Sequence, residues 1–174
     1  MSLLMAEADR LEKRNKEDKA RRHNSQEEYL TQKGLIEVCR MQLNSYPELK
    51  TLYAVPNGAN VGQEFNHSTG IYESRERQKL VSSGLKPGVF DLCLPISRCG
   101  YGSLYLETKS NKGRLSTEQK AWALLMHNAG NCCFVYRDIE HGWHLLRWYL
   151  KSNADLVHDM HKKCLQEAGH HEVN

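Results

Sequence analysis

The stretch that decides the fold is VFDLCL, residues 89–94, followed after a glycine-containing loop by SLYLETK, residues 103–109. Both runs have the apolar, aromatic and alternating character of strands, and their short separation predicts an antiparallel hairpin. Successive side chains of a strand point to opposite faces, so Glu107 and Lys109 project together, away from Thr108 and the leucines. Because Asp91 belongs to the first run, two acids and one lysine are predicted to converge at this strand pair.

The elements around this hairpin are predicted from periodicity and from turn residues. A first core helix is expected over residues 25–46, opened by a capping box of Ser25 and Glu28. A short strand over 51–55 stops at a Pro56-Asn57-Gly58 turn, and a polar helix over 71–82 ends before Gly84. After the hairpin, a helix begins with a Ser116–Gln119 capping box and ends at Gly130. It leads to a buried strand over 132–136, a β-α-β order, and then to a helix over 139–150.

Length and composition bound the organisation. A chain of 174 residues with 40% hydrophobic content suits one globular domain, which we assign to residues 25–151. Residues 1–24 form a charged N-terminal arm, either a solubilising tail or a basic arm that lies along a phosphate backbone or pairs subunits. Residues 152–174 form a His-rich C-terminal helix or tail. The net charge of +3 by itself indicates no particular partner.

The six cysteines include no Cys-x-x-Cys pair, and no apolar segment with a charged flank opens the chain. An intracellular, reduced protein is therefore expected. No apolar run approaches the roughly 20 residues needed to cross a bilayer, so no membrane partner is predicted.

The acids and the lysine are the residue types that phosphodiester hydrolysis needs. A divalent cation held by carboxylates neutralises phosphate oxygens and activates water, and hard oxygen ligands select Mg²⁺ or Mn²⁺. Asp91, Glu107 and the main-chain carbonyl of Thr108 are the predicted ligands. Lys109 would orient the attacking water or stabilise the charge that develops on phosphate. The plainer alternative is a salt bridge between Lys109 and an acid on an exposed sheet face.

The ordered set KPGVFDL (86–92), LYLETK (104–109) and GRLSTEQKAW (113–122), with Gly130 and the strand through Val135, resembles the VRR-NUC family of the PD-(D/E)xK nuclease superfamily. The resemblance is strongest to small stand-alone members from bacteria and phages, and it covers about residues 26–150. It implies an α/β fold with a restriction-endonuclease-like core, in which helices flank a central mixed β-sheet. It also implies metal-dependent cleavage of branched DNA.

Carried over by residue, the resemblance makes Asp91 and Glu107 the metal-binding acids, Lys109 the catalytic lysine and Gln119 the helix glutamine near the site. Glu28 matches the acid that the first helix contributes to the metal. The family usually has proline before the first catalytic acid, whereas this chain has Phe90. That proline shapes the backbone, so the change bears on local geometry and leaves metal binding intact.

The resemblance further implies a homodimer acting on four-way (Holliday) junctions, because two symmetric cuts need two active sites, in the cytoplasm of a bacterium or phage-infected host. Basic residues that bracket the site in sequence form a predicted DNA-binding rim or, alternatively, an ordinary solvated surface: Arg75, Arg77, Lys79, Lys86, Lys112, Arg114 and Lys120. A non-catalytic DNA-binding or assembly module on the same fold, a restriction-type enzyme and an RNA nuclease remain alternatives.

A zinc site is also conceivable at His158, His161 and Cys164, which recur at helical spacing. Steps of three residues spread these side chains over an arc of ~120°, which is too broad for easy convergence on one ion. Surface histidines of a tail are the preferred interpretation.

Overall fold

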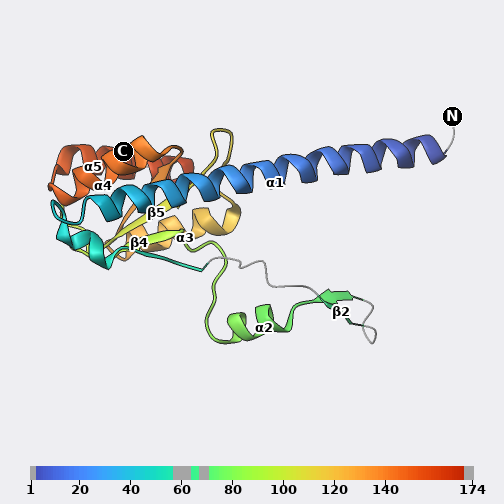
Figure 1. Cartoon of the computed structure of the whole chain (residues 1–174), viewed down its shortest axis with the longest axis horizontal. Coiled ribbons are helices and arrows are strands. Elements are labelled where there is room, and N and C mark those ends of the chain that lie inside the picture. Colours follow the sequence, from blue (N-terminus) through green and yellow to red (C-terminus); the bar gives the residue numbers. More distant parts are fainter. Residues whose placement is uncertain (1–2, 57–63, 67–70, 171–174) are drawn as a thin grey trace.

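A four-stranded mixed sheet forms the centre of the protein (Figure 1). The computed structural model describes residues 3–56, 64–66 and 71–170. The strand order is β1 (Tyr53–Ala54), β4 (Leu92–Leu94), β5 (Leu104–Thr108) and β6 (Cys132–Tyr136). β4 runs antiparallel to both of its neighbours, β1 and β5, and β6 pairs with β5 in parallel. The predicted α/β fold with a central mixed sheet and the predicted hairpin are both confirmed.

Helices cover both faces of the sheet, because alternate residues of its strands are apolar on each side. One core contains Leu106 and Phe134, and it packs against α1 (Leu3–Met41) and α4 (Ile139–Leu150). The other contains Cys133 and packs against α3 (Thr117–Asn128) and α5 (Ala154–Glu167). Glu107 belongs to this second face by alternation, since it is offset from Leu106 by one residue.

The predicted starts of two helices are confirmed. Ser116 caps α3 in a full capping box with Gln119, and the β5-α3-β6 unit has the parallel pairing that its order predicts. Gly130 adopts a φ of +76° just after this helix, as the left-handed turn at a helix end requires. Asp138 caps α4 by accepting from the main-chain nitrogen of His141.

The first helix is the main correction. α1 runs unbroken over 39 residues from Leu3 to Met41, so the capping box predicted at Ser25 does not start a helix. The preceding segment is rich in Lys, Arg, Glu and Ala, which favour continuing a helix over ending one. Gly34 lies inside α1 where a Cβ would stand 2.3 Å from Ile139 of α4, so this glycine permits close packing of the two helices.

Two further element predictions are partly wrong. The strand expected over 51–55 is shortened to Tyr53–Ala54, because Pro47 opens the 3-10 helix η1 (Pro47–Thr51). The helix expected over 71–82 begins only at Arg75, as α2 (Arg75–Ser82). Its first residues instead form β3 (Ile71–Glu73), which pairs with β2 (Glu64–Asn66) in a separate two-stranded sheet. The predicted Pro56-Asn57-Gly58 turn lies outside the described residues from Asn57 onward.

The C-terminal segment is a packed helix. α5 buries Val157, His161, Cys164 and Leu165, so the interpretation of these histidines as surface residues is wrong for His161. All six cysteines are free thiols. Across the described residues, no helix combines the length and the apolar character that a membrane span requires.

Candidate active site at the end of the central strand

The predicted acids meet where β4 and β5 pair. The register sets Leu92 opposite Leu106, and continuing it by one residue sets Asp91 opposite Glu107 on the same face. The two carboxylates are close enough for the charge of Asp91 to raise the pKa of Glu107. Alternation along β5 brings Lys109 to this face as well, and its Nζ lies 2.7 Å from Glu107 Oε1.

Glu107 is the electrostatic centre of the cluster. Its side chain is only 1% exposed, and burial, followed by the charge of Asp91, raises its pKa to about 8 despite the opposing effect of Lys109. Oε1 accepts hydrogen bonds from Lys109 and from Gln119 Nε2. Oε2 is buried without a hydrogen-bond partner among the residues that the structure describes. A buried carboxylate oxygen in this condition is costly unless a cation or a proton meets it.

Asp91 is held by the main chain of the opposite strand. Its Oδ2 accepts from the Thr108 nitrogen at 2.9 Å, and burial raises its pKa against the opposing effects of this bond and of Lys109. The loop before Asp91 is placed by Gly88, whose φ is +83° and whose Cβ would lie 2.6 Å from the main-chain oxygen of Glu118. Only glycine suits this turn, because both the backbone conformation and the approach of α3 exclude a side chain. Phe90, which precedes Asp91, is fully buried in the second core.

Glu28 reaches the site from α1, far away in sequence. Its Oε1 accepts from the main-chain nitrogen of Ser110 at 3.0 Å, just beyond the end of β5. Its charge raises the pKa of both Asp91 and Glu107, although less than burial does. A Cβ at Gly113 would lie 3.1 Å from Glu28 Oε1, so this glycine leaves room for the carboxylate.

Gln119 is aimed by its own helix cap. Its side-chain Oε1 accepts from the nitrogen of Ser116 at 2.9 Å, while its main-chain nitrogen donates to the Ser116 hydroxyl. With its oxygen engaged in the capping box, the amide presents Nε2 to Glu107. The motif that starts the helix therefore also orients a side chain toward the buried acid.

Glu28, Asp91 and Glu107 lie near one another but do not form a preformed metal-binding site. Within the described ranges, no group of three or more His, Cys, Asp or Glu side chains is gathered so that it could hold a metal ion. This applies to Glu28, Asp91 and Glu107, and equally to the His158, His161 and Cys164 alternative. In the arrangement shown, Lys109 and Gln119 take up one oxygen of Glu107, and main-chain nitrogens take up one oxygen each of Asp91 and Glu28.

Comparison with solved structures finds proteins of similar structure. A solved structure described as "VRR_NUC domain protein" aligns with 66% of this chain and 86% of its own chain, with 20% sequence identity and a TM-score of 0.48. No protein-family profile matches the chain, and neither does any curated protein.

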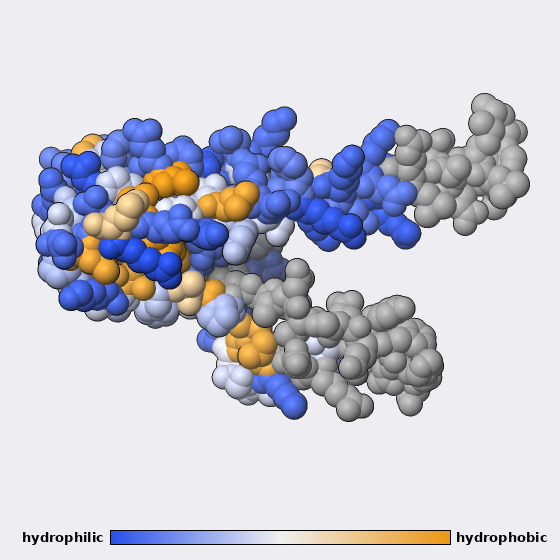
Figure 2. Space-filling view, viewed as in Figure 1, coloured by the Kyte–Doolittle hydropathy of each residue, from blue (hydrophilic) through white to orange (hydrophobic). Residues whose placement is uncertain are grey.

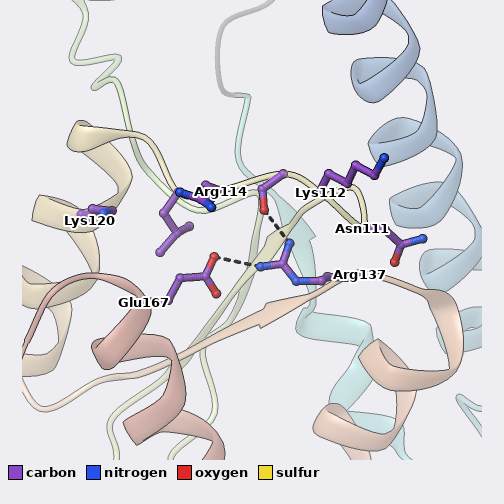
Figure 3. A pocket seen from close by; sticks show the side chains of 8 residues that line it. Asn111, Lys112, Arg114, Lys120, Arg137 and Glu167 are labelled. Atoms are coloured by element: carbon purple, nitrogen blue, oxygen red, sulfur yellow. Dashed lines mark hydrogen bonds and ion pairs between the residues drawn. The ribbon is translucent and has the colours of Figure 1, made fainter.

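A basic pocket lies behind the loop that follows β5. It measures about 710 Å³ and is lined by Lys112, Arg114, Lys120 and Arg137, with Glu167 as its acidic residue. Figure 3 shows Arg114 and Lys120 on the side of α3 and Lys112 on the side of α1, with Arg137 between them. Three of the predicted DNA-binding residues, Lys112, Arg114 and Lys120, thus line one pocket.

The other predicted DNA-binding residues lie elsewhere. Lys86 lines a separate, more apolar pocket of about 480 Å³ with Leu80 and Trp122. Lys79 is exposed on α2. The side chains of Arg75 and Arg77, on the same helix, lie outside the described residues. Among the described side chains, the residues of the predicted rim are therefore divided between a pocket lined by Lys112, Arg114 and Lys120 and a second pocket lined by Lys86.

Arg137 is the site residue that sequence reasoning missed. Its Nη1 donates to the carbonyl oxygens of Ser110 and Gly113 at 3.0 and 2.7 Å, and its Nη2 pairs with Glu167 at 2.8 Å. Arg137 thereby connects α5 to the loop whose main chain donates a hydrogen bond to Glu28. The available signal was its position directly after a strand parallel to β5, because the carboxyl ends of parallel strands meet at one edge of a sheet.

Proposed function

We propose that this chain is a divalent-metal-dependent nuclease that hydrolyses phosphodiester bonds of DNA. One observation carries the proposal: Glu107 is fully buried at the end of the central strand, beside Asp91 and Lys109, and one of its carboxylate oxygens has no hydrogen-bond partner in the described part of the chain. An exposed salt bridge, the plainer alternative, would have none of this burial. Burying an ionised carboxylate oxygen without a partner costs free energy, and a bound cation reduces that cost.

The donor set suits Mg²⁺ or Mn²⁺, both hard cations that prefer oxygen ligands. Glu107 Oε2 and the second oxygen of Asp91 are the proposed carboxylate ligands. The carbonyl of Thr108 is a third, because its own N–H already points toward Asp91 and a strand residue directs both groups to the same side. Glu28 would complete the set directly or through water, since Mg²⁺ keeps several waters and needs few protein ligands.

The cation would supply charge neutralisation at the phosphate and a lowered pKa for the attacking water. The chain's own groups do the rest. Lys109 is almost buried, so its ammonium acts in a low-dielectric setting on the charge that develops on phosphate. Gln119 holds Glu107 in one orientation, and Arg137 holds the loop on which Glu28 rests. The basic pocket beside this loop offers the next phosphates a favourable potential.

The test is cleavage of labelled four-way junctions, flaps, duplex and single strands, with Mg²⁺, with Mn²⁺ and in EDTA. We expect Glu107→Gln and Lys109→Ala to lower the rate by at least about 100-fold, as removal of one preorganised charge typically does. Glu140→Gln and Lys151→Ala are matched controls, because both residues are exposed on or next to α4. Full activity in folded Lys109→Ala would refute the assigned mechanism.

Branched DNA as the preferred substrate and a homodimer as the active form are further parts of the proposal. Two symmetric cuts in one junction need two active sites, which a two-fold dimer provides. Sedimentation with and without a junction tests the dimer, and the substrate panel tests the preference for branches. Calorimetry with Mn²⁺ separates the main alternative: DNA binding without any metal binding would assign a non-catalytic DNA-binding module.

A further inference from the structure

The N-terminal part of α1 projects beyond the layered body as a charged rod (Figure 1). We call residues 10–24 the α1 arm. Its described side chains are exposed except for a half-buried Asn24, and the visible surface there is hydrophilic (Figure 2). Between positions 10 and 22 the sequence has seven basic and three acidic residues, a net charge of +4 against +3 for the whole chain. The positive charge of the protein is therefore concentrated on a surface that no described element covers.

Three arginines of the arm share one face of the helix. At 3.6 residues per turn, Arg10, Arg14 and Arg21 fall within a sector of about 40°. Glu28, further along the same helix, falls within the same sector. Lys19 and Arg22 lie at least about 80° outside it. The three arginines are all exposed, and they form no ion pair with any side chain that the structure describes.

The contact of Glu28 shows where this face points. Glu28 Oε1 accepts from Ser110 at the end of β5, so at that level the sector faces the candidate active site. Arg21, Arg14 and Arg10 precede Glu28 by 7, 14 and 18 residues. At 1.5 Å per residue they stand about 10, 21 and 27 Å along the helix from the acid. Arg10, Arg14 and Arg21 therefore form a stripe, the arginine stripe, that continues in a straight line along α1 from the candidate active site.

We infer that this stripe binds the phosphate backbone of the duplex that flanks the scissile bond, an inference that rests on the proposed function. A duplex advances about 3.4 Å per base pair, so a reach of 27 Å corresponds to about 8 base pairs on one side of the cut. Guanidinium groups suit this role because their fork of donors matches a phosphate and stays charged. The contacts read no base sequence, which fits a nuclease selective for DNA shape.

The test compares two double variants of the full chain with equal loss of charge. Arg14→Gln with Arg21→Gln removes two members of the stripe, while Lys19→Gln with Arg22→Gln removes two charges from other faces of the arm. Binding to fluorescent four-way junctions is measured in EDTA, so that no strand is cut, across a series of salt concentrations. The junction arms, closed by hairpin loops, are either about 4 or about 16 base pairs long, which lie below and above the proposed reach.

On long arms, loss of two phosphate contacts should lower the salt slope by about 1.8 and weaken binding about 60-fold at 0.1 M salt. On short arms only Arg21 still finds a phosphate, so the slope should fall by about 0.9 and affinity about 8-fold. The control variant should bind both junctions within about twofold of wild type. Circular dichroism checks that every variant keeps its helix content.

Equal losses in the two double variants, or a loss that does not depend on arm length, would overturn the inference while leaving the nuclease proposal intact. A stripe variant that changes the sedimenting species but not DNA affinity would also overturn it, and would assign the arm to subunit pairing. Wild-type protein that binds no DNA in any of these conditions would overturn the inference about the stripe. Cleavage by wild type in Mg²⁺, run in parallel, tests the proposed function separately.

Discussion

Replacing Glu107 by glutamine should change how the stability of the metal-free protein depends on pH. The pKa of Glu107 is raised to about 8 in the folded chain, mainly by burial, against an ordinary value of 4.5. Between these two values the folded protein binds one proton more than the unfolded chain, so stability falls as pH rises. The loss is at most ~1.4 kcal/mol per pH unit and at most ~5 kcal/mol in all. Below the ordinary value of 4.5 the contribution of this group is fully present.

Urea denaturation in EDTA from pH 5 to pH 9 measures this effect in wild type, Glu107→Gln and the exposed control Glu140→Gln. The free energy of unfolding of wild type should decline relative to Glu107→Gln up to about pH 8, because glutamine carries no titrating proton. The free energy of unfolding of Glu140→Gln should follow that of wild type at every pH. This agreement would show that the difference between wild type and Glu107→Gln does not come from other titrating groups. Mn²⁺ should reduce the decline, because a cation stabilises the ionised carboxylate. Parallel curves for wild type and Glu107→Gln would refute the buried, strained state of this acid.

Three other substitutions test neighbouring parts of the fold. Gly113→Ala brings a Cβ to 3.1 Å from Glu28 Oε1, so we expect about tenfold weaker Mn²⁺ binding in calorimetry, as for outer-shell changes, with little change in melting temperature. Ser116→Ala removes the hydroxyl that accepts from Gln119; urea denaturation should show a loss of ~1 kcal/mol, and cleavage assays a lower rate. Burial lowers the pKa of His161 to about 4 from 6.5, so its stabilising contribution is present above pH 6.5 and lost as pH falls toward 4. His161→Gln should remove up to ~3 kcal/mol of this acid-side dependence between pH 7 and 4, and an unchanged acid transition would contradict it.

Sequence patterns predicted a helix or strand correctly where one local signal, such as a capping box or an alternation, dominated the segment. The Ser116–Gln119 capping box, the apolar run over 132–136 and the alternation in residues 104–109 all appear in the structure as predicted. The prediction was wrong at Ser25, where the same capping pattern occurs inside α1. A serine followed three residues later by glutamate can start a helix, but it does not oblige a helix to start when the preceding residues also favour helix. At residues 71–73 an apparent helix start became a strand because β2 offered a pairing partner.

For the candidate site, the sequence predicted which residues lie on one face but not all of those that meet there. Glu107 and Lys109 share a face because their spacing equals the strand period, and the structure shows their ion pair. Arg137 escaped prediction, since a lone arginine after a strand has no periodic signal. Its contacts with Ser110 and Gly113 depend on the packing of three separate segments. The burial of Glu107, which raises its pKa, is likewise a property of the folded chain as a whole.

The sequence alone determined the two acids and the lysine, their common face and the mixed sheet, because backbone geometry imposes a period that nearby residues reveal. Only the tertiary structure decided that Glu28, 79 residues before Glu107, contacts the end of the same strand. It also decided that an uninterrupted α1 aligns Arg10, Arg14 and Arg21 with that acid. Such placements depend on which surfaces pack together and on where a helix fails to stop, and these are properties of the whole chain.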